Sequence, residues 1–222
     1  MRIFERIISI PLSLYVCLRL LPFKQAIILP IIVRYNCKLK SLKGYVVLSS
    51  KTIKPNMLSI GFGKVGVFDK RYSRTILEIN GKMIVHGKAT FGHGSKICIL
   101  REGILEIGNQ FSNTAECTII CEKKITIGDR ALVSWNTLIM DTDFHECIHL
   151  DTNTIPPKTK EIIIGSQVWI GTRSVILKGS YIPDGCIIGA ASVVNKIFND
   201  NNCLLAGNPA TIRKREITLN IS

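Results

Sequence analysis

The sequence predicts an all-β fold, a parallel β-helix of hexapeptide repeats with a short, partly helical N-terminal segment. The first observation is a period of six: between residues 164 and 194 an aliphatic side chain returns at every sixth position. This period fits neither a helix at 3.6 residues nor a strand that alternates at two. The second is that a small side chain usually follows four positions after each aliphatic one. The third is that Gly165, Gly171 and Gly189 come directly after aliphatic residues, where we expect turns with positive φ.

Each hexapeptide is expected to supply one short strand and one corner, so that three of them close a triangular coil. The aliphatic side chains then stack inside, where each contributes about 1.5–3 kcal/mol by leaving water. No single coil can bury its own apolar side, and several must therefore stack. The expected interior positions of this stretch are Ile164, Ile170, Ile176, Ile182, Ile188 and Val194.

Residues 1–45 differ from the rest of the chain. They are rich in Ile, Leu and Val and carry eight basic residues against the single acidic Glu5, a net charge of +7 out of +13. The longest uncharged run, residues 7–18, is too short to cross a bilayer. A signal peptide is disfavoured because residues 15–17 supply no small-residue cleavage site. Two interpretations stay open: helices on an anionic membrane surface, or a cap over the open end of the coil.

Residues 46–200 are assigned to the β-helix itself. The spacing is weak before residue 79, regular from there on, and slips twice, as loops extruded at corners would cause. Residues 140–161 are polar and contain two consecutive prolines, so we predict a long extruded loop there, of the kind that is often functional. Residues 201–222 are expected to form a basic C-terminal tail.

The charge and the cysteines limit the possible partners. A net charge of +13 suits nucleic acid, an anionic membrane or an anionic small molecule. No DNA- or RNA-binding motif accompanies it, so we expect no nucleic-acid partner. The eight cysteines form no C-x-x-C pair, and Cys186 falls on a small inward position. They are therefore expected to be reduced thiols of a cytoplasmic protein rather than disulfides or zinc ligands.

Three stretches make the chain similar to a known family. V-W-I-G-T-R-S-V-I-L-K-G at residues 168–179, I-I-G-A-A-S-V-V at 187–194 and A-G-N-P-A at 206–210 resemble the hexapeptide-repeat acyltransferases of the sugar O-acetyltransferase type. The resemblance covers about residues 79–214. It implies a left-handed parallel β-helix, acetyl-CoA as the donor co-substrate, a sugar hydroxyl or amine as the acceptor, and a homotrimer with active sites at the subunit boundaries. No metal is expected.

His145 is the candidate general base. Acetyl transfer to a hydroxyl requires a base that takes the proton, donors that stabilise the oxyanion, and two substrates held together. His145 stands at the root of the extruded loop, histidine titrates near neutral pH, and the matching histidine of the family has this role. Asp143 or Asp141 is expected to orient its ring. Because this chemistry needs no covalent step, Cys147 is not expected to act as a nucleophile.

The resemblance also implies a donor site along the outside of the coils. Gly171 and Thr172 would approach the thioester, and Ala190 would contact the pantetheine arm through its backbone. The residues expected to meet the CoA phosphates are Asn195, Lys196, Arg213 and Lys214. Thr211 stands where a basic residue is often found in the family, which leaves the phosphate contact open between Arg213 and Lys214. The acceptor pocket is expected between subunits, with contacts from Asn113, Asp141 and Trp169.

The sequence therefore predicts an acetyl-CoA-dependent O-acetyltransferase of bacterial surface polysaccharide (O-antigen or capsule) biosynthesis. It is expected in the cytoplasm, and the membrane interpretation of residues 1–45 favours peripheral contact with the inner membrane face and a lipid-linked acceptor. One alternative is a γ-type carbonic anhydrase, although His93, His145 and His149 are not convincingly spaced for zinc. The other is a catalytically silent scaffold. His86 and His93 lie beside glycines and are expected at solvent-facing corners.

Overall fold

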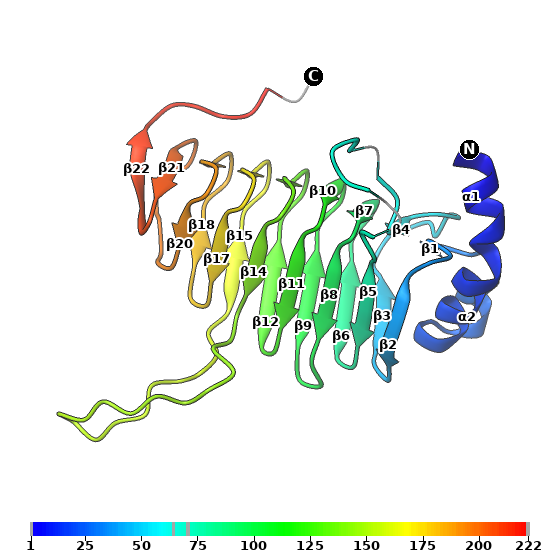
Figure 1. Ribbon diagram of the computed structural model, residues 1–222, viewed down its shortest axis with the longest axis horizontal. Coiled ribbons are helices and arrows are strands. Elements are labelled where there is room, and N and C mark those ends of the chain that lie inside the picture. Colours follow the sequence, from blue (N-terminus) through cyan, green and yellow to red (C-terminus); the bar gives the residue numbers. More distant parts are fainter. Residues whose placement is uncertain (1, 64, 70–71, 221–222) are drawn as a thin grey trace.

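The computed structural model describes residues 2–63, 65–69 and 72–220, and within them the chain winds into a triangular prism with helices at one end (Figure 1). In this described part the prism has three sides, which are sheets of nine, seven and six strands. Up to β20, successive strands occupy successive sides, and neighbours within a sheet are parallel except for the last pair, β21 and β22. The predicted all-β parallel β-helix is confirmed.

The strands are distributed over the three sides as follows. The nine-stranded sheet contains, in order, β1 (Ile31–Val33), β4 (Leu58–Ile60), β7 (Ala89–His93), β10 (Phe111–Ala115), β13 (Leu132–Val133), β16 (Trp169–Ile170), β19 (Ile187–Ile188), β21 (Leu204–Gly207) and β22 (Ala210–Lys214). The seven-stranded sheet contains β2 (Lys38–Leu42), β5 (Ile76–Ile79), β8 (Lys96–Ile99), β11 (Thr118–Cys121), β14 (Leu138–Met140), β17 (Val175–Leu177) and β20 (Val193–Val194). The six-stranded sheet contains β3 (Tyr45–Leu48), β6 (Lys82–Val85), β9 (Ile104–Ile107), β12 (Lys124–Ile127), β15 (Ile162–Ile164) and β18 (Tyr181–Ile182).

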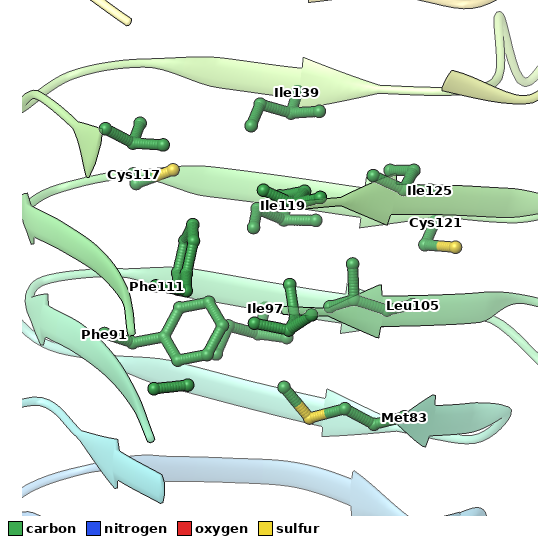
Figure 2. Packing of buried hydrophobic residues seen from close by; sticks show 14 of the residues in the cluster. Met83, Phe91, Ile97, Leu105, Phe111, Cys117, Ile119, Cys121, Ile125 and Ile139 are labelled. Carbon is green, nitrogen blue, oxygen red and sulfur yellow. The ribbon is translucent and has the colours of Figure 1, made fainter. Parts of the chain in front are cut away.

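The register of the sheets confirms the period of six. In the seven-stranded sheet Ile97 pairs with Ile119, and Ile119 pairs with Ile139, so that their side chains stack in one interior column (Figure 2). The column continues through Ile176 to Val194. All six expected interior positions between residues 164 and 194 are at most 1% exposed. The core is therefore a set of side-chain columns that run along the prism.

Gly165, Gly171 and Gly189 serve close stacking rather than positive φ, which corrects the expectation. The positive φ values lie two residues later, at Gln167 (57°), Arg173 (59°) and Ala191 (56°). At Gly171 a Cβ atom would lie 2.7 Å from the amide nitrogen of Ala190 in the next coil. Neighbouring strands in a sheet are only about 4.8 Å apart. Glycine is therefore required where two corners approach, while the left-handed backbone falls on residues with side chains.

The coil begins at residue 31, inside the segment that the sequence analysis separates from the β-helix. Strands β1 to β3 complete a first triangular turn by residue 48. The helices α1 (Arg2–Ile8), α2 (Ile10–Leu20) and α3 (Phe23–Ala26) lie at this end of the prism (Figure 1). Val16, Cys17 and Leu20 of α2 are buried in the same core as the first strands. No helix in the described part of the chain is long and apolar enough to cross a bilayer.

The C-terminal residues are more regular than a tail. β21 continues the nine-stranded sheet, and β22 folds back on it as an antiparallel partner, with Gly207 opposite Ala210. The hairpin lies at the opposite end of the prism from the helices (Figure 1).

All eight cysteines are free. Cys186 is fully buried at its inward position. Burial raises the pKa of Cys37 and of Cys117 to about 12, so these thiols stay protonated at neutral pH. Cys147 is exposed. The buried thiols fill small spaces in the interior and are poor nucleophiles in the folded protein.

Gly128 provides a test of the stacking argument. A Cβ atom there would lie 2.6 Å from the carbonyl carbon of Gly165 and 2.6 Å from the amide nitrogen of Ser166, both backbone atoms of the next coil. We expect Gly128→Ala to cost about 2 kcal/mol of unfolding free energy and to lower the melting temperature by about 4–8 °C. Gly66→Ala is the matched control, because nothing lies within 4 Å of its added methyl group. Equal melting temperatures for the two variants would contradict the argument.

Candidate active site

The extruded loop is an extended arm, defined here as residues 141–161, which leaves the prism between β14 and β15 (Figure 1). Its two sides pair as an antiparallel ribbon. The N–H of Asp143 donates to the carbonyl of Lys158 (3.0 Å), and that of His149 donates to the carbonyl of Thr154 (2.9 Å). Beyond the root the arm projects away from its own prism, and residues 143–155 are all exposed.

Asp141 holds the root of the arm from inside. Its side chain is fully buried. Its carboxylate accepts the backbone N–H groups of Glu122 (2.7 Å), Lys123 (2.9 Å) and Lys124 (2.7 Å). A carboxylate that is saturated in this way is not free to contact an acceptor sugar, nor to orient His145. The structure thus gives Asp141 a different place from the acceptor contact that the sequence analysis expects.

Two charged residues outside the arm fix its direction, and the sequence analysis assigns no role to either. The carboxylate of Glu122 accepts a hydrogen bond from the Thr142 hydroxyl (2.5 Å) and pairs with the Lys158 ammonium (2.5 Å). These two contacts hold the pKa of Glu122 below its ordinary value, with Lys158 as the larger cause. On the other side, Lys178 pairs with Asp143 (2.5 Å) and donates to the carbonyl of Pro157 (2.9 Å).

His145 lies on the arm with its side chain exposed to solvent. Asp143 is engaged with Lys178, and within the described residues no hydrogen bond joins it to His145. The arrangement can accept a proton from a hydroxyl that approaches the imidazole from outside the chain. A substrate at His145 would meet few other groups of the same chain, because residues 143–155 of the arm are all exposed.

Four of the expected donor residues share one corner of the prism. Thr172 follows β16, and its carbonyl accepts the N–H of Ala191 from the next coil (2.9 Å). Its hydroxyl donates to the carbonyl of Trp135 in the preceding coil (2.9 Å). One coil further, Arg213 Nε donates to the carbonyl of Ala206 (3.2 Å). The residues brought into this line along the prism, here called the donor corner, are Gly171, Thr172, Ala190 and Arg213.

The remaining donor residues are spread more widely. Asn195 and Lys196 follow β20 and therefore lie at another corner. The Lys196 ammonium lies 5.3 Å from the centroid of the Phe198 ring. Lys196 and Arg215 line a depression of about 400 Å³, while Lys214 is exposed on β22. The structure thus separates the expected phosphate contacts into two groups, one near the donor corner and one near the depression.

Asn113 is also an interior side chain. It is 1% exposed. Its Oδ1 accepts the N–H of Gly92 (2.9 Å), and its Nδ2 donates to the Ser95 hydroxyl (2.9 Å). The acceptor contact expected of Asn113 is therefore corrected, because its side-chain amide is bonded inside the prism. Trp169 is half-buried on β16, and its Nε1 donates to the Ser134 hydroxyl (3.1 Å).

The other three histidines differ in burial and lie on different parts of the chain. His93 is fully buried, with its ring 5.7 Å from that of Phe68, so the expected solvent-facing corner is wrong for it. His86 is exposed and lies 2.7 Å from Glu106. His149 is on the arm, away from His93 on β7. Within the described residues no three His, Cys, Asp or Glu side chains gather as a metal site would require.

Comparison with known proteins gives relatives over most of the chain. No family model matches it. An uncharacterised 24.8 kDa protein in the cps region of Klebsiella pneumoniae is 31% identical over 205 residues, which are 91% of this chain and 87% of that protein. Galactoside O-acetyltransferase of Escherichia coli K12 is 33% identical over 122 residues, 55% of this chain and 55% of the enzyme.

Among solved structures, the chain is similar to the polySia-specific acetyltransferase NeuO. The TM-score is 0.60 at 22% sequence identity, and the match covers 86% of this chain and 82% of NeuO. At this level of identity the likeness shows a shared fold, which is the left-handed parallel β-helix.

Glu122→Gln tests whether Glu122 fixes the arm. Because the carboxylate is partly exposed, we expect at most a roughly fivefold loss of amide protection in the arm, measured by hydrogen exchange. The pKa of Glu122 is lowered in the folded chain, so the contact is intact above the ordinary value of 4.5 and is lost as the pH falls through the lowered value. The difference from the wild type should therefore disappear in acid. The control is Glu102→Gln, whose carboxylate is 87% exposed. Equal protection of the arm at neutral pH in the wild type and Glu122→Gln would refute this role.

Proposed function

The chain belongs to the hexapeptide-repeat acyltransferases of the sugar O-acetyltransferase type, and from this we propose that it moves an acetyl group from acetyl-CoA to a glycan hydroxyl, with His145 as the general base. The glycan class we propose is bacterial surface polysaccharide. Two relatives support it: one lies in a cps region, and one is named as specific for polySia. Eight free thiols suit a reducing compartment, and we place the reaction in the cytoplasm.

The proton transfer is assigned to His145 because its side chain is exposed on the arm. It takes the proton of the acceptor hydroxyl as that oxygen attacks the acetyl carbon. The imidazolium that forms can then donate this proton to the sulfur of the departing CoA thiolate. Asp143 acts on this step by holding the arm through Lys178.

The donor corner suits a long, amide-rich ligand that ends in phosphates. Gly171 and Ala190 bring backbone close to the surface, while the Arg213 guanidinium lies beside Ala206 one coil further on. Guanidinium is a strong partner for phosphate. Acetyl-CoA supplies an acetyl thioester, which is already activated for transfer. The donor corner holds it and orients its acetyl group, and no covalent acyl-enzyme is required.

We propose that the site is completed by a neighbouring copy in a homotrimer. The arm exposes Phe144 (48%), Ile148 (50%), Leu150 (91%) and Ile155 (58%). An isolated two-stranded ribbon is marginal in water, and these side chains need a surface to cover them. A second prism beside the first offers that surface, and His145 of one copy then faces the donor corner of the next. Trp169, half-buried on β16, is assigned to the same boundary.

Replacing His145 tests the assignment of the base. We expect His145→Ala to lower kcat by about 10²–10⁴-fold, measured with labelled acetyl-CoA and a panel of glycan fragments. Binding of CoA by calorimetry and the mass in solution should not change. His149→Ala is the matched control on the same arm, because the hydrogen bond that His149 makes there is a backbone one. Equal turnover by His145→Ala and the wild type would remove the assignment.

Mixing two inactive variants tests the shared site. Ala190→Trp would block the donor corner, while His145→Ala removes the base. If each site combines one copy's arm with another copy's donor corner, about one quarter of the boundaries in randomly mixed trimers contain both intact halves. Co-refolded mixtures should therefore recover activity that neither variant has. No recovery, or a monomer mass in light scattering, would overturn the shared site.

A further inference from the structure

The helices at the N-terminal end expose a concentrated apolar surface, defined here as the outer cap face. Among the described residues, ten of the 22 exposed large hydrophobic side chains lie between residues 4 and 28. They are Phe4, Ile7, Ile8, Ile10, Leu14, Tyr15, Leu18, Phe23, Ile27 and Ile28. A soluble chain does not usually gather so many apolar side chains in one place without a partner.

The inner side of α2 bonds to the edge of the first strand through two side chains. The Ser13 hydroxyl accepts the N–H of Val33 (2.9 Å), and the Cys17 thiol donates to the carbonyl of Ile31 (3.3 Å). Both partners belong to β1, which is the first strand of its sheet. An open strand edge invites pairing with other chains, and the helix covers it with polar side chains.

α2 is apolar on both of its sides, because Val16 and Leu20 are buried in the core while its outward side is also apolar. Ser13 and Cys17 are fully buried, whereas Ile10, Leu14 and Leu18 are 43%, 38% and 46% exposed. Residues four apart lie on one face of a helix, so the exposed side of α2 is a stripe of Ile10, Leu14 and Leu18. The exposed half of this helix carries one charge, that of Arg19. A helix with this pattern is stable against an apolar medium rather than against water.

The positive charge around the outer cap face favours an anionic partner. Glu5 is the single acidic residue of the first 45, and it is bonded to Arg34 (3.0 Å). Arg6, Arg19 and Lys24 are exposed among the apolar side chains. A second copy facing this surface would bring one segment of +7 against another. An anionic bilayer offers an apolar interior and negative headgroups together.

We propose that the outer cap face docks on the surface of an anionic lipid bilayer. The helices lie in the plane of the interface with their apolar side chains in the acyl region, and Arg19 and Lys24 meet lipid phosphates. The C-terminal hairpin, at the other end of the prism, then points away from the lipid (Figure 1). This proposal does not depend on acetyl transfer. In a trimer with parallel prisms, three faces would lie on one side and bind together.

The test is co-sedimentation of the full chain with vesicles of phosphatidylglycerol and phosphatidylcholine, compared with phosphatidylcholine alone. We expect binding to the anionic vesicles. Leu18→Glu combined with Phe23→Glu should weaken it by about tenfold or more, because the apolar contact is removed. Arg19→Gln combined with Lys24→Gln should weaken it by about fivefold for each charge at low salt. Ile197→Glu is the control: its side chain is 64% exposed near the other end, and binding should not change.

Thermal melts that match the wild type show that each variant is folded. Binding of the Leu18→Glu/Phe23→Glu variant as tight as that of the wild type would overturn the proposal. Failure of the wild type to co-sediment with the anionic vesicles would also overturn it. Another outcome is a wild-type protein whose mass in solution doubles as its concentration rises. If Leu18→Glu/Phe23→Glu abolishes that doubling, the outer cap face is a contact between copies and not a lipid site.

Discussion

The stacking of each corner's backbone directly on the next is the constraint on which the rest of the structure depends. At Gly128 and Gly171 there is no room for a Cβ atom between coils. Because the coils stack without offset, interior side chains form columns, and exterior groups form lines in the same way. The donor corner is one such line, since Thr172 is bonded to Trp135 in the preceding coil and to Ala191 in the next. A surface that suits an extended ligand follows from the packing that makes the core.

The sequence predicts the features that depend on the repeat itself. It does not predict those that depend on contacts with residues of other coils. The period of six places Val133 and Ile170 correctly at opposed interior positions. It cannot tell that Asn113, at an equivalent position, is satisfied inside by Gly92 and Ser95. An interior amide is costly without such bonds, and the bonds come from residues about twenty positions away. The prediction of positive φ at Gly165, Gly171 and Gly189 is wrong for a similar reason. The requirement for glycine comes from the distance between two stacked coils, and the sequence of one coil does not show that distance.

The arm shows the same division. Its existence is predictable, because 25 residues separate Ile139 from Ile164 where the repeat needs a multiple of six. Its direction is not, because that depends on Glu122 and Lys178, which stand on outward positions where charges are usually solvated. These contacts fix only the root. Beyond it the apolar side chains have no cover within the described chain. In the proposed trimer, the neighbouring copy would therefore set the position of His145 relative to the donor corner.

A prism of parallel strands has two open ends, and each must be closed. At the C-terminal end β22 turns back and pairs with β21, which uses main-chain groups and leaves little new apolar surface. At the N-terminal end the helix α2 covers the strand edge. The main-chain groups along a helix are already bonded within the helix, so they cannot pair with the strand. It offers the side chains of Ser13 and Cys17 to the strand edge, beside Val16 and Leu20, which are buried in the core. Ile10, Leu14 and Leu18 lie on the opposite side of the same helix, so the element that closes the strand edge also contributes to the outer cap face.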